Sequence, residues 1–176
     1  MRVVAALATV AALLAAFVLL VDRNRPGAVG TRREHARLVD GFNRASVRRL
    51  TIARTGAASF SLVRQPPGGD PAWRVAPGDG AADTAAVEDL LAAIDLAESE
   101  RTADLTPTAA GLAPPAVTID LDTGGAPLSV RLGRADAAVG VFVAVGAQAA
   151  IRVGPRRLLD LADRAVGAYA PSPARP

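Results

Sequence analysis

The feature that most constrains this chain is a run of nineteen uncharged, mostly apolar residues near its start, at positions 3–21. As a helix, the run would be about 28 Å long at about 1.5 Å per residue, close to the hydrocarbon thickness of a bilayer. Backbone groups in lipid must bond to one another, so we expect a continuous helix. Pro26 and Gly27 follow and predict its end. We therefore predict a single-pass membrane anchor over residues 1–22.

A cleaved signal peptide is the alternative interpretation of this run. Such a peptide has an apolar region of about 7–15 residues and a cleavage site with small side chains. The run here is longer, and it ends in bulky side chains from Phe17 to Val21. The sequence therefore favours an uncleaved anchor. The chain has no cysteine, which excludes a lipidated cysteine, disulfides and thiolate chemistry.

The charges that flank the run do not decide on which side of the membrane the rest of the chain lies. One arginine precedes the run, and several follow it: Arg23, Arg25, Arg32, Arg33 and Arg37. The positive-inside rule would keep the following domain in the cytoplasm, but long domains can cross the membrane despite such charges. Both orientations stay open on this ground.

The basic residues of the chain do not indicate a nucleic-acid-binding protein. All 20 are arginine, the net charge is only +3, and aromatic residues make up 3% of the sequence. Proteins that bind single strands need aromatic side chains on which bases stack, and most nucleic-acid-binding proteins concentrate their charge on one face. We therefore expect no nucleic-acid partner.

Downstream of the anchor we expect a linker, one domain and a tail. The linker covers residues 23–46, with a short helix that Thr31 and Glu34 cap and that runs to Val39. A single domain covers residues 47–168, and a disordered tail covers 169–176.

Alternating apolar and polar residues predict the strands of the domain. The first hairpin joins residues 47–54 to 59–64 and pairs Ile52 with Phe60 and Leu50 with Leu62. A third strand covers 73–75. Asp83 or Thr84 caps a helix over 84–97, and residues 98–105 return as a weakly indicated strand. The apolar stripe of that helix is Val87, Leu90, Leu91 and Ile94.

Two further hairpins and a terminal helix follow. In the first of these hairpins, residues 123–126 form the connection, and the pairs are Val117–Leu132, Ile119–Val130 and Leu121–Leu128. In the second, the expected pairs are Val141–Val153, Val143–Ile151 and Val145–Ala149. Pro155 begins the terminal helix. The predicted fold class is α+β: an N-terminal transmembrane helix, then a mainly antiparallel sheet of hairpins with a helix over one face.

Two carboxylates of the strand predicted from Val117 onward are the first candidates for chemistry. Asp122-Thr123-Gly124 has the triplet of aspartic proteases, but that reaction needs two such carboxylates, so a single copy requires a homodimer. The same residues are common in turns, and the register requires a turn here. Asp120 and Asp122 share a strand face and could bind a hard cation, although a solvated surface is the simpler interpretation.

The remaining candidates have weaker patterns. Gly78-Asp79-Gly80 precedes a helix but lacks the third glycine and the lysine of a phosphate loop, so we interpret it as a linker. Glu98, Glu100 and Asp104 near Arg101 are interpreted as a charged, solvated helix end. The single histidine, His35, lies among charged residues and is interpreted as solvated. The sequence thus predicts no catalytic residue, no cofactor and no metal ligand.

Across residues 1–165 the chain resembles the family catalogued as domain of unknown function 4340. The likeness rests on the amino-terminal apolar run, residues 42–52, Trp73-Arg74-Val75, the predicted helix over Thr84–Ile94, Gly111-Leu112-Ala113-Pro114-Pro115, the hairpin 117–133 and the run 141–145. Ala110 departs from it, because family members often have tyrosine there. The resemblance implies no established activity. It implies a setting beside transport systems of the ABC type, with the domain outside the cytoplasmic membrane.

Taken together, the sequence predicts a non-enzymatic interaction module held in the cytoplasmic membrane by one span. Its expected partners are the membrane, subunits of an ABC-type transporter or other envelope proteins. Two alternatives stay open: a dimeric hydrolase that uses Asp120 and Asp122, and a structural spacer.

Overall fold

The computed structural model describes residues 36–68, 72–99, 101–136, 140–147 and 150–171. The chain divides into two compact units, residues 1–34 and 35–176, and only the second contains described residues. The predicted anchor, the cap at Thr31 and Glu34, and His35 therefore lie outside the described residues. Within the described ranges, no helix is long and apolar enough to cross a membrane.

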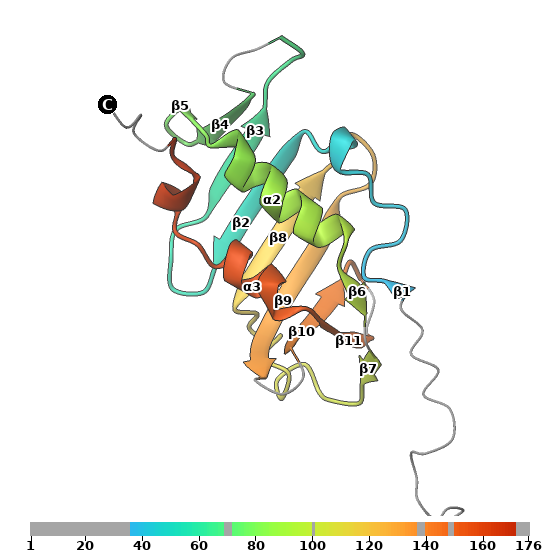
Figure 1. The fold of residues 1–176 in the computed structure, drawn as a ribbon. Coiled ribbons are helices and arrows are strands. Elements are labelled where there is room, and N and C mark those ends of the chain that lie inside the picture. The colour runs from blue at the N-terminus through green and yellow to red at the C-terminus, as the bar shows by residue number, and fades with distance from the viewer. Residues whose placement is uncertain (1–35, 69–71, 100, 137–139, 148–149, 172–176) are drawn as a thin grey trace, which may run out of the picture. The chain divides into compact units, whose positions relative to one another are not determined.

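The described residues form a long antiparallel sheet, a very small second sheet and two helices (Figure 1). The strands are β1 (Ala36–Arg37), β2 (Arg49–Arg54), β3 (Phe60–Arg64), β4 (Trp73–Ala76), β5 (Gly80–Ala81), β6 (Glu98–Ser99), β7 (Arg101–Ala103), β8 (Val117–Asp122), β9 (Leu128–Asp136), β10 (Gly140–Val145) and β11 (Ile151–Gly154). The helices are α2 (Thr84–Asp95) and α3 (Arg156–Ala162), with 3-10 turns η1 (Arg44–Ser46) and η2 (Val166–Tyr169). The nine-stranded sheet has the order β5-β4-β3-β2-β8-β9-β10-β11-β7, and β1 pairs with β6.

The predicted α+β class with a transmembrane helix is wrong for the described residues, which are mostly β-sheet. Several segments expected to be loops or helix form short strands. The helix predicted to run to Val39 is replaced at its end by β1, and Gly80–Ala81 form β5. The strand predicted over residues 98–105 is found as two short strands, β6 and β7. Only 12 and 7 residues remain in α2 and α3. Very short strands carry no periodicity that a sequence pattern can detect.

The main core lies on one face of the sheet, beneath both helices. Figure 1 shows α2 and α3 crossing that face side by side. The fully buried side chains include Leu50, Ile119 and Leu132 from the strands and Leu90 and Leu158 from the helices. Alternation along each strand turns every second side chain to this face.

The strands at the centre of the sheet have the predicted registers. Leu50 pairs with Leu62 and Ile52 with Phe60 in the first hairpin. The β8–β9 hairpin also has its predicted pairs, with Ile119 opposite Val130 at the centre. These strands bury one face only, and a slip by one residue would expose all their apolar side chains.

The predicted register of the β10–β11 hairpin is wrong by one residue. Val141 pairs with Gly154, and Phe142 pairs with Val153. The reason is that β10 is buried on both faces: Val141, Val143 and Val145 face the main core, whereas Phe142 and Ala144 belong to a second cluster. A strand without a polar face does not show which side should meet its partner.

The second cluster is covered by the loop between β7 and β8. Ala110 and Leu112 of this loop pack on Phe142, Ile151 and Val153. The loop packs against a bulge in β9. At this bulge two residues, Gly133 and Arg134, lie between the partners of Val141 and Val143. The Arg134 N–H donates a hydrogen bond of 2.8 Å to the Ala110 carbonyl.

Residues predicted as linker and tail also contribute to the core. Leu38, Val39 and Phe42 are buried in the main cluster, and Tyr169 is 1% exposed there. Tyr169 donates a hydrogen bond of 2.9 Å from its hydroxyl to the carbonyl of Leu161. The burial of its ring raises the pKa of Tyr169 to about 12, although Arg164 and Arg54 act in the opposite direction.

Candidate functional site

Asp120 lies on the face of the sheet opposite the two helices. Ser61, Thr51, Asp120 and Ser129 stand opposite one another on β3, β2, β8 and β9 and form one polar row. The hydroxyls of Thr51 and Ser61 are 2.8 Å apart and share a hydrogen bond. Asp120 is exposed, as a solvated strand face predicts.

Asp122 stabilises the turn that follows β8. Its Oδ1 accepts a hydrogen bond of 2.8 Å from the N–H of Gly124, and Gly124 has a φ of +80°. These are the contacts of an aspartate that closes its own turn. Among the described residues, no three His, Asp or Glu side chains lie close enough together to hold a metal ion. No specific contact therefore favours the protease or cation hypotheses.

Gly78 and Asp79 lie in the turn between β4 and β5, and Gly80 begins β5. Asp79 has a φ of 57°, and its carbonyl accepts a hydrogen bond of 2.9 Å from Arg74. The segment is thus a strand connection and not a linker. Glu98 lies on β6 and Arg101 on β7, and both are exposed; Glu100 lies outside the described residues.

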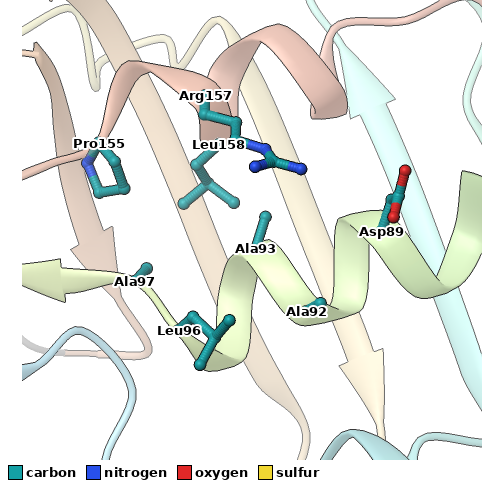
Figure 2. A pocket seen from close by; sticks show the side chains of 8 residues that line it. All are labelled: Asp89, Ala92, Ala93, Leu96, Ala97, Pro155, Arg157 and Leu158. Carbon is teal, nitrogen blue, oxygen red and sulfur yellow. The ribbon is translucent and has the colours of Figure 1, made fainter.

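On the helix side of the sheet, the described residues form an apolar hollow between α2 and α3 (Figure 2). We name it the α2–α3 hollow. Its volume is about 160 Å³. It is lined by Asp89, Ala92, Ala93, Leu96, Ala97, Pro155, Arg157 and Leu158.

The sequence of α2 positions one wall of the hollow. Asp83 caps the helix, since its Oδ1 accepts hydrogen bonds of 2.9 Å and 3.2 Å from the N–H groups of Ala85 and Ala86. The buried stripe from Val87 to Ile94 fixes the rotation of the helix on the sheet. Asp89, Ala92, Ala93 and Leu96 follow one another at helical spacing on an adjoining face, and Figure 2 shows them beside the hollow.

The other wall begins where β11 ends. Pro155 is the N-cap of α3, and its ring fits the start of a helix because it has no N–H group to leave unpaired. Leu158 is fully buried and forms the floor of the hollow, whereas Arg157 is exposed at its rim.

Leu96 is the most unusual side chain of the hollow. It is 73% exposed, although leucine is among the residues most often buried in proteins. It is the C-cap of α2 and stands off the buried stripe of that helix. The exposure of Leu96 could have been expected from the sequence, because Leu96 is apolar but lies outside the predicted stripe of the helix. It was not among the candidate residues named from the sequence.

Two opposite charges flank this apolar surface without pairing. Neither the carboxylate of Asp89 nor the guanidinium of Arg157 has an ion-pair partner among the described residues. By contrast, Oε1 of Glu88 lies 3.2 Å from Nη2 of Arg64, and Oδ1 of Asp95 lies 3.9 Å from Nη1 of Arg37. The hollow therefore offers carbon atoms at its centre and one charge of each sign at its rim.

No family model matches the sequence, and neither a curated protein nor a solved structure is detectably similar to it. The resemblance to the family of domain of unknown function 4340 stays a prediction.

Proposed function

We propose that this chain is a membrane-anchored, non-enzymatic module that binds another protein chain through the α2–α3 hollow. The observation that supports it is an apolar hollow with an exposed leucine at its edge. Aliphatic side chains that enter pockets are a common core of protein interfaces, and polar groups usually surround them.

The lining suits an apolar side chain more than a small polar substrate. Ala92, Ala93, Ala97, Pro155 and Leu158 present mainly carbon atoms. Covering an exposed leucine stabilises a complex by about 1.5–3 kcal/mol when the side chain becomes fully buried. A partner that covers Leu96 therefore gains most from the contact if it also fills the hollow.

The sequence supports the membrane setting. The uncharged run at residues 3–21 has the length and composition of a membrane span. The resemblance to the family of domain of unknown function 4340 favours the outer face of the cytoplasmic membrane and a transport assembly of the ABC type as the setting. Both statements are part of the proposal.

A photo-crosslinking experiment in cells tests the binding site. A photoreactive amino acid replaces Leu96 in the tagged full-length chain, and a second variant has it at Ser129, on the sheet face opposite the helices. We expect protein adducts from position 96 and few from position 129. Equal yields from the two positions would refute the α2–α3 hollow as the binding site.

Two further measurements test the setting. Alkaline carbonate should leave the full-length chain with the membrane fraction and release a variant that lacks residues 3–21. Protease added to spheroplasts should digest the domain if it lies outside the cytoplasmic membrane, and protection would contradict that placement.

A further inference from the structure

We infer that the partner in the α2–α3 hollow is the same surface of a second copy of this chain, arranged as a two-fold dimer. The inference rests on the proposed function, because it treats the hollow as a protein contact, and it goes further by naming the partner.

The charges at the rim are self-complementary. Asp89 and Arg157 are exposed, lie on one face, and have no ion-pair partner among the described residues. In a two-fold dimer the same patch meets itself, so a contact between residues i and j occurs twice. A two-fold axis in the plane of this face can place Asp89 of each copy opposite Arg157 of the other. One association step would pair all four charges.

The shape of the surface is self-complementary as well. The same patch contains a projecting side chain, Leu96, and a hollow beside it. Ala92 and Ala93 have small side chains, which allow the backbones of two helices to come close. A second copy supplies both a leucine to enter the hollow and a hollow to receive the leucine.

Anchoring would favour this contact although the patch is small. Stable interfaces between free proteins bury about 1,200–2,000 Å² in total, which is more than one hollow and one leucine provide. Two chains held in the same membrane meet at a high effective concentration, so a weak contact is populated without a large interface. We therefore expect a dimer that depends on both the hollow and the anchor.

Charge reversal of Asp89 and Arg157 gives a direct test with the full-length chain. The unchanged chain is placed in vesicles of phosphatidylcholine and phosphatidylglycerol. A photo-activated crosslinker that does not rely on amine groups should then link it into a dimer. D89R alone and R157D alone should each lose the dimer, because each places two like charges together. The double variant D89R/R157D should recover it.

Mixing the two single variants sharpens the test. A vesicle that contains both D89R and R157D should give a mixed dimer, because each of the two contacts between positions 89 and 157 then joins an arginine to an aspartate. Differently sized tags on the two variants identify the mixed species. Recovery in the mixture cannot arise from misfolding of either variant, which makes this the decisive measurement.

Engineered cysteines provide a second readout, since the chain has no cysteine of its own. A chain with Leu96→Cys and a differently tagged chain with Ala93→Cys, mixed in the same vesicles, should form a mixed disulfide on mild oxidation, because Leu96 of one copy enters the hollow that Ala93 of the other copy lines. Val166→Cys, mixed with the same Ala93→Cys chain, serves as the matched control, because Val166 is another exposed large apolar residue, 42% exposed, and lies outside the hollow. It should remain mostly monomeric.

The outcomes separate this inference from the proposed function. If neither the mixture nor the double variant recovers a dimer, or if Leu96→Cys and Val166→Cys form disulfides with Ala93→Cys equally, the dimer is refuted. If the photoreactive group at position 96 then captures a different protein, the binding function stands with another partner. If position 96 captures nothing, both proposals are wrong.

Discussion

Replacement of Gly133 by alanine should destabilise the domain by roughly 1–6 kcal/mol. Gly133 lies in the β9 bulge, where the β7–β8 loop contacts the sheet. A Cβ atom added there would lie well inside the van der Waals contact distance of the Ala110 carbonyl oxygen. The backbone of Gly133 is not in the left-handed region, so the penalty would arise from this contact and not from the torsion angles of alanine.

The magnitude follows from how far the loop must move. Carbon and oxygen atoms in contact are usually about 3.3 Å apart or more, so Ala110 must shift by about 1 Å. Such a shift disrupts the 2.8 Å hydrogen bond between the Arg134 N–H and the Ala110 carbonyl. A buried hydrogen-bonding group without its partner costs about 1–3 kcal/mol, and overpacking adds about 1–3 kcal/mol. The smaller entropy of an unfolded chain with alanine offsets about 0.4–1 kcal/mol of this sum.

Urea denaturation of the purified full-length protein measures the effect. Trp73 is the single tryptophan and is 1% exposed, so its fluorescence reports unfolding of the main core. Gly125→Ala is the matched control, because the nearest atom to its added Cβ lies 4.0 Å away. We expect the control to change the free energy of unfolding by less than about 0.5 kcal/mol. Equal stability of Gly133→Ala and Gly125→Ala would refute the reasoning about the bulge.

Three further predictions follow from buried or capping side chains. Asp83→Ala should lower stability by about 1 kcal/mol because α2 loses its cap, whereas Asp83→Asn should retain most of it, as measured by urea denaturation. Leu158→Ala should lower it by about 2–5 kcal/mol in the same assay, because Leu158 is fully buried beneath the hollow. The pKa of Tyr169 is raised from 10.0 to about 12, so the unfolded chain ionises first as the pH rises, and stability should be lost between those values. Tyr169→Phe should remove this part of the pH dependence, and a Tyr169→Phe profile identical to that of the unchanged protein would contradict the assignment.

The sequence predicted the centre of the sheet well for a physical reason. In β2, β3, β8 and β9 about every second side chain is buried, and apolar and polar residues alternate accordingly in the sequence. Leu50, Ile52, Ile119 and Val130 could therefore be paired correctly. The start of α2 was predicted to within one residue, because Asp83 and Thr84 both have side chains that cap helices, and Asp83 is the cap.

The margins of the fold could not be predicted in the same way. In β10, Phe142 and Val143 are both buried, one on each face, so the apolar pattern fits two registers. β1 and β5 contain two residues each, which is too few for any period. They are defined by their pairing instead, β1 with β6 and β5 with β4.

The α2–α3 hollow was missed because its two walls are far apart in the sequence. Ala93 and Arg157 become neighbours only when both helices pack on the same face of the sheet. The local sequence contained one indication, an apolar Leu96 outside the stripe of its helix. The candidates with recognisable motifs, Asp122 and Asp79, proved to be turn residues.

The lengths of the outermost strands have a consequence for how this protein avoids aggregation. The long sheet ends in β5, with two residues, and in β7, with three. A long, unpaired edge strand would offer a ladder of free N–H and C=O groups on which further chains could add. Such short edges offer few backbone groups for pairing, so fibre-like growth of the sheet has little to start from. Copies of this chain that meet repeatedly therefore have little exposed backbone edge through which to aggregate.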